Sequence, residues 1–203
     1  MAEVGIEIDI YRNNTVAEWS EKLADPESRP DTGSAAATAA AVAASLLCRG
    51  FRIAAKDIEP DGQLDWYVRN SEILRDYMVR LIDEDVKCHG PLRRALKEGD
   101  EHRIEASRQA AVSICLEIVN MMGKCLEMAE GLLPYDDLRI RSCAAECAEL
   151  AFSASRCAGD YILYMSRLSP DDTYRYVMKR ENELTLQEQQ THLEQIRSAF
   201  SGQ

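Results

Sequence analysis

One aspartate stands where the apolar stripe of a predicted helix needs a hydrophobic residue. In the segment LIDEDVKCHGPL the stripe passes through Leu81, Cys88 and Leu92, and Asp85 falls on it between Leu81 and Cys88. We therefore expect this carboxyl group to point at the core or at a cleft between helices. Burial disfavours an ionised carboxyl group and raises its pKa, which suits a general acid or base. Asp85 is accordingly the candidate catalytic residue.

Helix geometry alone leaves a second interpretation of Asp85 open. The carboxylate would then pair with a lysine or arginine from another helix, or cap a kink at Gly90-Pro91, where proline removes a backbone donor. The neighbouring Asp83 and Glu84 project in other directions, and both are expected to be solvated.

The second candidate site is a turn before an alanine-rich run that ends at Leu47. A helix N-terminus preceded by small residues presents free amides and the positive end of the helix dipole to a ligand. The same turn is also typical of an ordinary helix start, capped by Asp31 or Thr32. Alanine lets neighbouring backbones approach closely, so we expect this helix to be central. The turn consists of Pro30, Asp31, Thr32, Gly33 and Ser34.

Seven cysteines lie inside helical patterns and not in loops. Their odd number and the lack of an export signal predict reduced thiols in a cytoplasmic protein. Cys143 and Cys147 share a helix face, but no histidine lies near them to complete the four ligands that zinc usually takes, so no metal site is predicted. Cys88 and His89 are adjacent and point about 100° apart, which disfavours a thiol–imidazole dyad. The cysteines are Cys48, Cys88, Cys115, Cys125, Cys143, Cys147 and Cys157.

Hydrophobic spacing predicts an all-α fold, an up-and-down bundle of about five to six helices, several of them long. We interpret residues 1–203 as one domain, with residues 1–13 as an N-terminal arm and residues 173–203 as a polar C-terminal helix. Within the arm, the alternating residues 6–10 form either a short strand or an extended segment. Thr15 and Glu18 make a capping-box pattern for the first helix. The helices are expected at residues 15–25, 33–56, 63–98, 101–130, 137–168 and 173–200.

Composition excludes several classes of protein. The chain has 203 residues, and its 24 basic and 35 acidic residues give a formal charge of −11, which opposes binding to duplex nucleic acid. The alanine-rich run comes nearest to a membrane span, but it is weakly hydrophobic and contains Ser and Thr, so no span is predicted. The segment MAEVGIEIDI lacks the basic and apolar regions of a secretory signal.

Aromatic and histidine side chains give weaker signals. Tyr161, Tyr164, Tyr174 and Tyr176 either line a cleft for a ring-shaped ligand or pack in the core. His102 and His192 stand among charged residues and are expected to be exposed.

The order of these motifs resembles the cyclodeaminase/cyclohydrolase family. That family includes the C-terminal domain of formiminotransferase-cyclodeaminase and bacterial methenyltetrahydrofolate cyclohydrolases. Its opening motif is a helix with an aromatic residue, a P-G-G-G-S turn and an Ala-rich helix, matched here by Trp19, the turn of residues 30–34 and residues 35–47. Its L-x-D-x-D-A-E-A-F line is similar to LIDEDVKCH, with Asp85 on the family's prominent aspartate. The resemblance covers residues 15–168.

The chain departs from the family pattern at positions that the resemblance assigns to substrate binding. Asp31 and Thr32 replace two of the three glycines, and the Asp31 carboxylate repels an anionic group that the turn would otherwise receive. Where the family shows G-N-x-N-A-x-S-D, residues 136–143 read DDLRIRSC, so Ser142 is kept and Cys143 replaces the aspartate. By resemblance, the substrate-binding residues are Pro30, Asp31, Thr32, Gly33, Ser34, Ser142 and Cys143.

The resemblance implies one-carbon chemistry on tetrahydrofolate without a metal or redox cofactor. A cyclohydrolase opens the methenyl bridge with water to give 10-formyl-tetrahydrofolate, and a cyclodeaminase closes 5-formimino-tetrahydrofolate and expels ammonia. Asp85 would stabilise the cationic centre and move a proton. Lys56, Arg139 and Arg141 are candidates for holding the glutamyl tail of the folate, and a homodimer is expected. The alternative is a divergent member with lost or altered activity that serves as a small-molecule-binding or helical assembly module.

Overall fold

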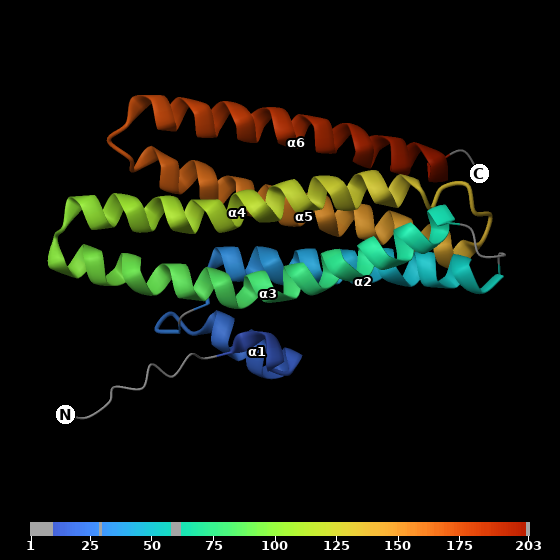
Figure 1. The fold of residues 1–203 in the computed structure, drawn as a ribbon, viewed down its shortest axis with the longest axis horizontal. Coiled ribbons are helices and arrows are strands. Elements are labelled where there is room, and N and C mark those ends of the chain that lie inside the picture. Colours follow the sequence, from blue (N-terminus) through green and yellow to red (C-terminus); the bar gives the residue numbers. More distant parts are fainter. Residues whose placement is uncertain (1–9, 29, 58–61, 202–203) are drawn as a thin grey trace.

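The computed structural model describes residues 10–28, 30–57 and 62–201 of the chain. Within those ranges the fold is all-α and contains no strand, as the hydrophobic spacing predicts. Long helices run side by side along one axis (Figure 1). The elements are the 3₁₀ helix η1 (Tyr11–Asn13) and the helices α1 (Val16–Ala24), α2 (Thr32–Asp57), α3 (Gly62–Glu98), α4 (Glu101–Glu130), α5 (Leu138–Arg167) and α6 (Asp172–Ser201).

Helix α2 is the centre of the bundle, as its alanine content predicts. It packs on α3 and α5 along most of its length and also touches α4. Its inward positions are small, with Ala37, Ala40 and Ala44 fully buried. At Gly50 a Cβ atom would lie 2.7 Å from a methyl carbon of Leu132, so the turn after α4 packs on α2 more closely than any side chain allows.

The same helix has the length and composition of a membrane span, contrary to the expectation that its run is too weakly hydrophobic. The segment Thr32–Lys56 passes that test, and 61% of its apolar window is buried inside the bundle. Because this apolar surface packs against α3 and α5, we interpret α2 as a core helix.

Local capping signals place the helix ends close to where the sequence predicts them. The Thr15 side chain accepts a hydrogen bond from the amide of Glu18, and the Glu18 carboxylate accepts one from the amide of Thr15. The predicted capping box is therefore confirmed. Asp100 and Asp137 cap α4 and α5 in the same sense. Gly99 ends α3 at φ 70°, a left-handed conformation that favours glycine.

Helix α6 forms the outer layer and packs on α5 and α4 (Figure 1). Its polar composition is consistent with one buried stripe, of which Leu193 and Ile196 are the most enclosed apolar residues. Gln189 lies on the same stripe and donates to the carbonyl of Val119 at 2.7 Å. The polar C-terminal helix therefore joins the bundle through a narrow stripe of its surface.

The prediction that Asp83 is solvated is wrong. Its side chain accepts from the amides of Tyr11 at 2.8 Å and Arg12 at 3.2 Å, and its other oxygen lies 3.3 Å from Arg12 Nε. The 3₁₀ turn therefore covers this carboxylate and ties the N-terminal segment to α3. The expected strand or arm at residues 6–10 lies outside the described residues, apart from Ile10.

Helix α1 lies outside the bundle, below α2 and α3 in Figure 1. None of its residues is buried, and Val16 is 83% exposed. Trp19 is half-buried and meets Tyr11 edge to face, with ring centroids 6.1 Å apart. The amphipathic face of this helix is thus largely uncovered in the single chain.

All seven cysteines are free thiols, and only Cys157 is exposed. Cys125 and Cys147 lie 3.5 Å apart between α4 and α5, and Cys143 is buried against α2. No group of three or more His, Cys, Asp or Glu side chains in residues 10–28, 30–57 and 62–201 is placed to hold a metal ion.

Candidate functional site

Asp85 lies inside the bundle, as its position on the apolar stripe predicts, and none of its surface is exposed. Its Oδ2 accepts two hydrogen bonds from Ser34, one from the amide at 2.8 Å and one from the hydroxyl at 2.7 Å. The carboxyl group of α3 therefore caps the first turn of α2. Among the described residues, Asp85 has no hydrogen bond or ion pair with a lysine or arginine, and none with the backbone at Gly90-Pro91, the two alternatives from the sequence.

Gly33 makes this approach between α2 and α3 possible. A Cβ atom at that position would lie 2.1 Å from Oδ1 of Asp85, so any side chain would collide with the carboxyl group. Pro30 is buried beside this contact, whereas Asp31 and Thr32 are exposed. The turn and the buried acid, both singled out in the sequence, thus meet at one place.

The hydrogen bonds around Asp85 reach only one of its two oxygens. Ser34 Oγ has one hydrogen but lies 2.7 Å from Asp85 Oδ2 and 3.1 Å from the carbonyl of Ile82. That single hydrogen can serve only one of these two acceptors at a time. The other oxygen, Oδ1, is buried and has no hydrogen-bond partner among the described residues, a costly situation for a carboxylate.

The electrostatic environment acts in the same direction. Burial raises the pKa of Asp85 above its ordinary value of 3.8, and nearby Asp31 adds to the rise. The interaction with His89 and the hydrogen bonds from Ser34 oppose this shift without cancelling it. Asp85 therefore holds its proton to a higher pH than an exposed aspartate does.

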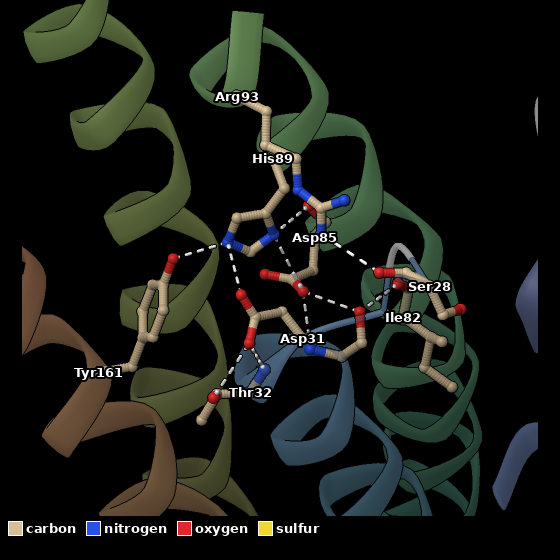
Figure 2. A network of polar contacts seen from close by, with 9 residues as sticks. Ser28, Asp31, Thr32, Ile82, Asp85, His89, Arg93 and Tyr161 are labelled. Carbon is tan, nitrogen blue, oxygen red and sulfur yellow. Dashed lines mark hydrogen bonds and ion pairs between the residues drawn. The ribbon is translucent and has the colours of Figure 1, made fainter. Parts of the chain in front are cut away.

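His89 is the second member of the site. It is 5% exposed and lies one turn after Asp85 on α3. Its Nδ1 lies 3.1 Å from the main-chain oxygen of Asp85 and 3.6 Å from Oδ2, while Nε2 lies 2.6 Å from the hydroxyl of Tyr161. Figure 2 shows the imidazole between Tyr161 of α5 on one side and Asp85 and Asp31 on the other.

The contacts of His89 indicate its tautomer. A carbonyl oxygen can only accept, so the Nδ1 hydrogen donates to Asp85 and leaves the lone pair on Nε2. The Tyr161 hydroxyl donates to that lone pair, and burial raises the pKa of Tyr161, so the phenol stays protonated. Nε2 is thus the proton-accepting atom of the site.

Asp31 faces the same imidazole from the solvent side. Its Oδ2 lies 3.8 Å from Nε2 of His89, and its side chain is 48% exposed. Its Oδ1 accepts from the amide of Thr32 at 2.7 Å, which fixes the carboxylate at the head of α2. On α3, Arg93 donates to the carbonyl of Ser28 at 3.2 Å and holds the loop before this turn (Figure 2). Asp31 therefore lies on the exposed side of the buried pair.

The contacts of His89 were not predicted from the sequence, where only a dyad with Cys88 was weighed. The usable signal was the four-residue spacing from Asp85, since residues at i and i+4 lie on one helix face. Tyr161 was considered as a cleft or core residue, but its partner lies 72 positions earlier in the chain and could not be identified without the fold.

The structure does not bring the other two substrate-binding candidates to Asp85 within one chain. Ser142 is exposed and Cys143 is buried in the first turns of α5, whereas Tyr161 lies near its end. The 18 residues from Cys143 to Tyr161 span about 27 Å at the helical rise of 1.5 Å per residue. Cys143 instead packs on α2, where its Cβ lies 3.3 Å from the position that a Cβ of Gly50 would take.

Of the three cations considered for a glutamyl tail, two share a groove. Lys56 and Arg139 line a groove of about 500 Å³ on the outer face of α2. Arg141 lies elsewhere, 3.3 Å from Asp136 and over the ring of Phe200.

Comparisons with known proteins agree with this architecture. The family model described as formiminotransferase-cyclodeaminase matches residues 15–181. A crystal structure of formiminotetrahydrofolate cyclodeaminase from Thermotoga maritima superposes with a TM-score of 0.85 at 16% identity, over 94% of this chain and 97% of that chain. At this identity the likeness shows the fold. No curated protein matches the sequence. The family match covers most of the chain, and the protein therefore belongs to the formiminotransferase-cyclodeaminase family as a divergent member.

Proposed function

We propose that this protein acts on the one-carbon unit of a reduced folate, as a methenyltetrahydrofolate cyclohydrolase or a formiminotetrahydrofolate cyclodeaminase. Two kinds of evidence support the proposal: membership of the family and the likeness to a cyclodeaminase fold. The observation that carries it is the buried contact of Asp85, His89 and Tyr161 at the head of α2, with Nε2 of His89 held as a proton acceptor.

Both reactions need one group that takes up a proton and returns it. In the cyclohydrolase reaction, water bonds to the cationic methenyl carbon and loses one proton, which passes to solvent. The hydroxyl group so formed then loses its own proton as the bond from that carbon to N5 breaks, and N5 takes up a proton. In the cyclodeaminase reaction, N10 bonds to the formimino carbon and loses its proton, and the amino group leaves as ammonia after gaining one. A single imidazole beside the tetrahedral carbon can perform both transfers.

His89 has the contacts for this role. Its Nδ1 hydrogen donates to the carbonyl of Asp85, so the ring orientation is fixed and Nε2 is the basic nitrogen. The substrate approaches from the exposed side at Asp31 and takes the place of the Tyr161 hydroxyl as the partner of Nε2. Asp31, 3.8 Å away, stabilises the imidazolium once the proton has moved.

The acidic character of the site suits a cation. The exposed carboxylate of Asp31 faces the imidazole and has no lysine or arginine partner among the described residues. A carboxylate here repels an anionic group but favours the positive charge of a methenyl or protonated formimino carbon. Asp31 replaces a glycine of the family's turn. Its negative charge is compatible with the one-carbon end of the substrate but not with the anionic glutamyl tail.

Purified protein tests this proposal directly. We expect the protein to hydrolyse methenyltetrahydrofolate faster than the uncatalysed reaction in buffer, measured as the loss of the methenyl absorbance. Alternatively, we expect it to release ammonia from 5-formiminotetrahydrofolate. If neither substrate reacts above background and no reduced folate binds, the assigned chemistry is wrong.

A second candidate is a divergent family member that kept the bundle and uses it for binding or assembly. The observation that favours it is the complete burial of Asp85 as a cap on α2, because such a cap stabilises the fold without any reaction. A folded protein that binds a reduced folate without turnover would support this candidate over the enzyme.

We also propose that the protein forms a homodimer. The support is the uncovered apolar surface of α1, where Val16 is 83% and Leu23 40% exposed, together with Val42 of α2 at 48%. An amphipathic helix with no buried residue gains stability when a second surface covers its apolar face.

A further inference from the structure

Five basic side chains gather around the groove on the outer face of α2. This groove, called here the basic groove, is about 500 Å³ in volume, and no acidic residue lines it. The concentration is unusual for a chain with a formal charge of −11. Its cations are Arg49, Arg52 and Lys56 of α2, Arg75 of α3 and Arg139 of α5.

Three of these cations have carboxylate partners at the rim. Arg52 lies beside Glu72, with Nε 3.0 Å from Oε1, Arg75 lies 2.7 Å from Asp76, and Arg139 lies 2.6 Å from Asp137. Exposed pairs of this kind contribute about 0–1 kcal/mol each, so an incoming anion can replace the carboxylate at small cost.

Arg49 supplies charge that is not already neutralised. It is exposed, and no ion pair to it occurs among the described residues. A guanidinium group binds carboxylate and phosphate through two parallel hydrogen bonds, which makes it the preferred residue for such ligands.

The spacing of the cations indicates the size of the ligand. Arg49, Arg52 and Lys56 stand at i, i+3 and i+7 on one face of α2, so their attachment points span about 10 Å. Cys48 and Ile53 add an apolar floor between them. A single small anion can contact the cations at only one end of this row, whereas a ligand with several anionic groups can contact all three.

We propose that the basic groove binds a small ligand that carries two or more phosphate or carboxylate groups. The groove is a separate site from the Asp85 centre, since Arg49 lies 15 residues after Ser34 on α2, about 22 Å along the helix. Binding there requires no catalysis at Asp85. Failure of this proposal and failure of the proposed enzyme activity are therefore distinguishable.

Calorimetric titration with two probes tests the proposal and identifies the anion. Tripolyphosphate represents the phosphate source, and a triglutamate peptide represents the carboxylate source. We expect saturable binding of at least one probe that weakens as salt is added, because the contacts are ionic. Tighter binding of one probe assigns the chemistry, and no saturable binding of either overturns the proposal.

Charge reversal locates the binding. The double variant Arg49→Glu/Arg52→Glu should weaken binding of the better probe about 10-fold or more, since two guanidinium contacts are lost. The control Lys97→Glu/Arg180→Glu changes the net charge by the same amount at exposed positions on α3 and α6 and should leave the affinity within about 2-fold. Equal weakening in both variants would show a general charge effect and contradict a site in the groove.

Discussion

Position 33 has no room for a side chain, because a Cβ there would lie 2.1 Å from an oxygen of Asp85. The absence of a side chain brings the amide and hydroxyl of Ser34 within hydrogen-bonding distance of the same carboxyl group. At the scale of single residues, Asp85 can be buried against α2 only because position 33 is a glycine.

Gly33→Ala should therefore destabilise the fold. The new methyl group forces α2 away from Asp85 and weakens both hydrogen bonds from Ser34, so the free energy of unfolding should fall by about 1–3 kcal/mol. Gly90→Ala is the matched control on α3, because nothing lies within 4 Å of its Cβ position, and it should raise that free energy by about 0.5–1 kcal/mol. Urea denaturation of both variants measures the difference. If the two changes have the same effect, the close approach at Gly33 is incorrect.

Asp85→Asn should remove a pH dependence of stability. Since the folded pKa of Asp85 is raised above 3.8, the native protein binds more protons than the unfolded chain between these two values. The wild type should lose stability relative to the variant as pH rises through that window, whereas below pH 3.8 both states are protonated and the difference is constant. Unfolding free energies measured from pH 3 upward check this sign. Parallel curves would contradict a raised pKa, and a wild type that gains stability relative to the variant would indicate a lowered one.

At the scale of helices, several boundaries were predictable because the residues at those ends carry local capping groups. Thr15 with Glu18, Asp100 and Asp137 are local caps that need no tertiary information. Gly99, in a left-handed conformation, ends α3 for an equally local reason. The centrality of α2 also followed from the sequence, because alanine allows close packing.

What the sequence could not reveal depends on contacts between distant segments. Asp83 looks solvated on an isolated helix, but the turn at Tyr11 covers it. The hydroxyl of Tyr161 reaches His89 only because α5 and α3 place these residues at the same end of the bundle. Cys143 lies in the opposite part of α5 for the same geometric reason, so motif order alone could not indicate which candidates meet.

At the scale of the whole molecule, charge is divided between two separate places. The acidic centre at the head of α2 contains Asp31 and Asp85, and the basic groove lies farther along the same helix. Such a division suits a cationic one-carbon group at one place and anionic groups at the other.

The uncovered face of α1 leads to a prediction about assembly. We expect light scattering at micromolar concentration to give twice the chain mass of 22.8 kDa. Val16→Glu/Leu23→Glu places charge on that face and should shift the mass toward the single chain, because buried like charges oppose association. Tyr176→Glu, at an exposed position on α6, is the control that should leave the mass unchanged. A wild type that stays monomeric would refute the dimer.

The most direct test of the central claim is the rate of methenyltetrahydrofolate and 5-formiminotetrahydrofolate conversion by wild type, His89→Gln and His102→Gln side by side. We predict turnover by the wild type on at least one substrate. We expect a loss of about 100-fold or more in His89→Gln, because the proton carrier is gone. No loss is expected in His102→Gln, whose imidazole is exposed at the start of α4. Equal rates in all three proteins, or no rate above buffer in the wild type, would contradict the assignment of His89 as the proton carrier.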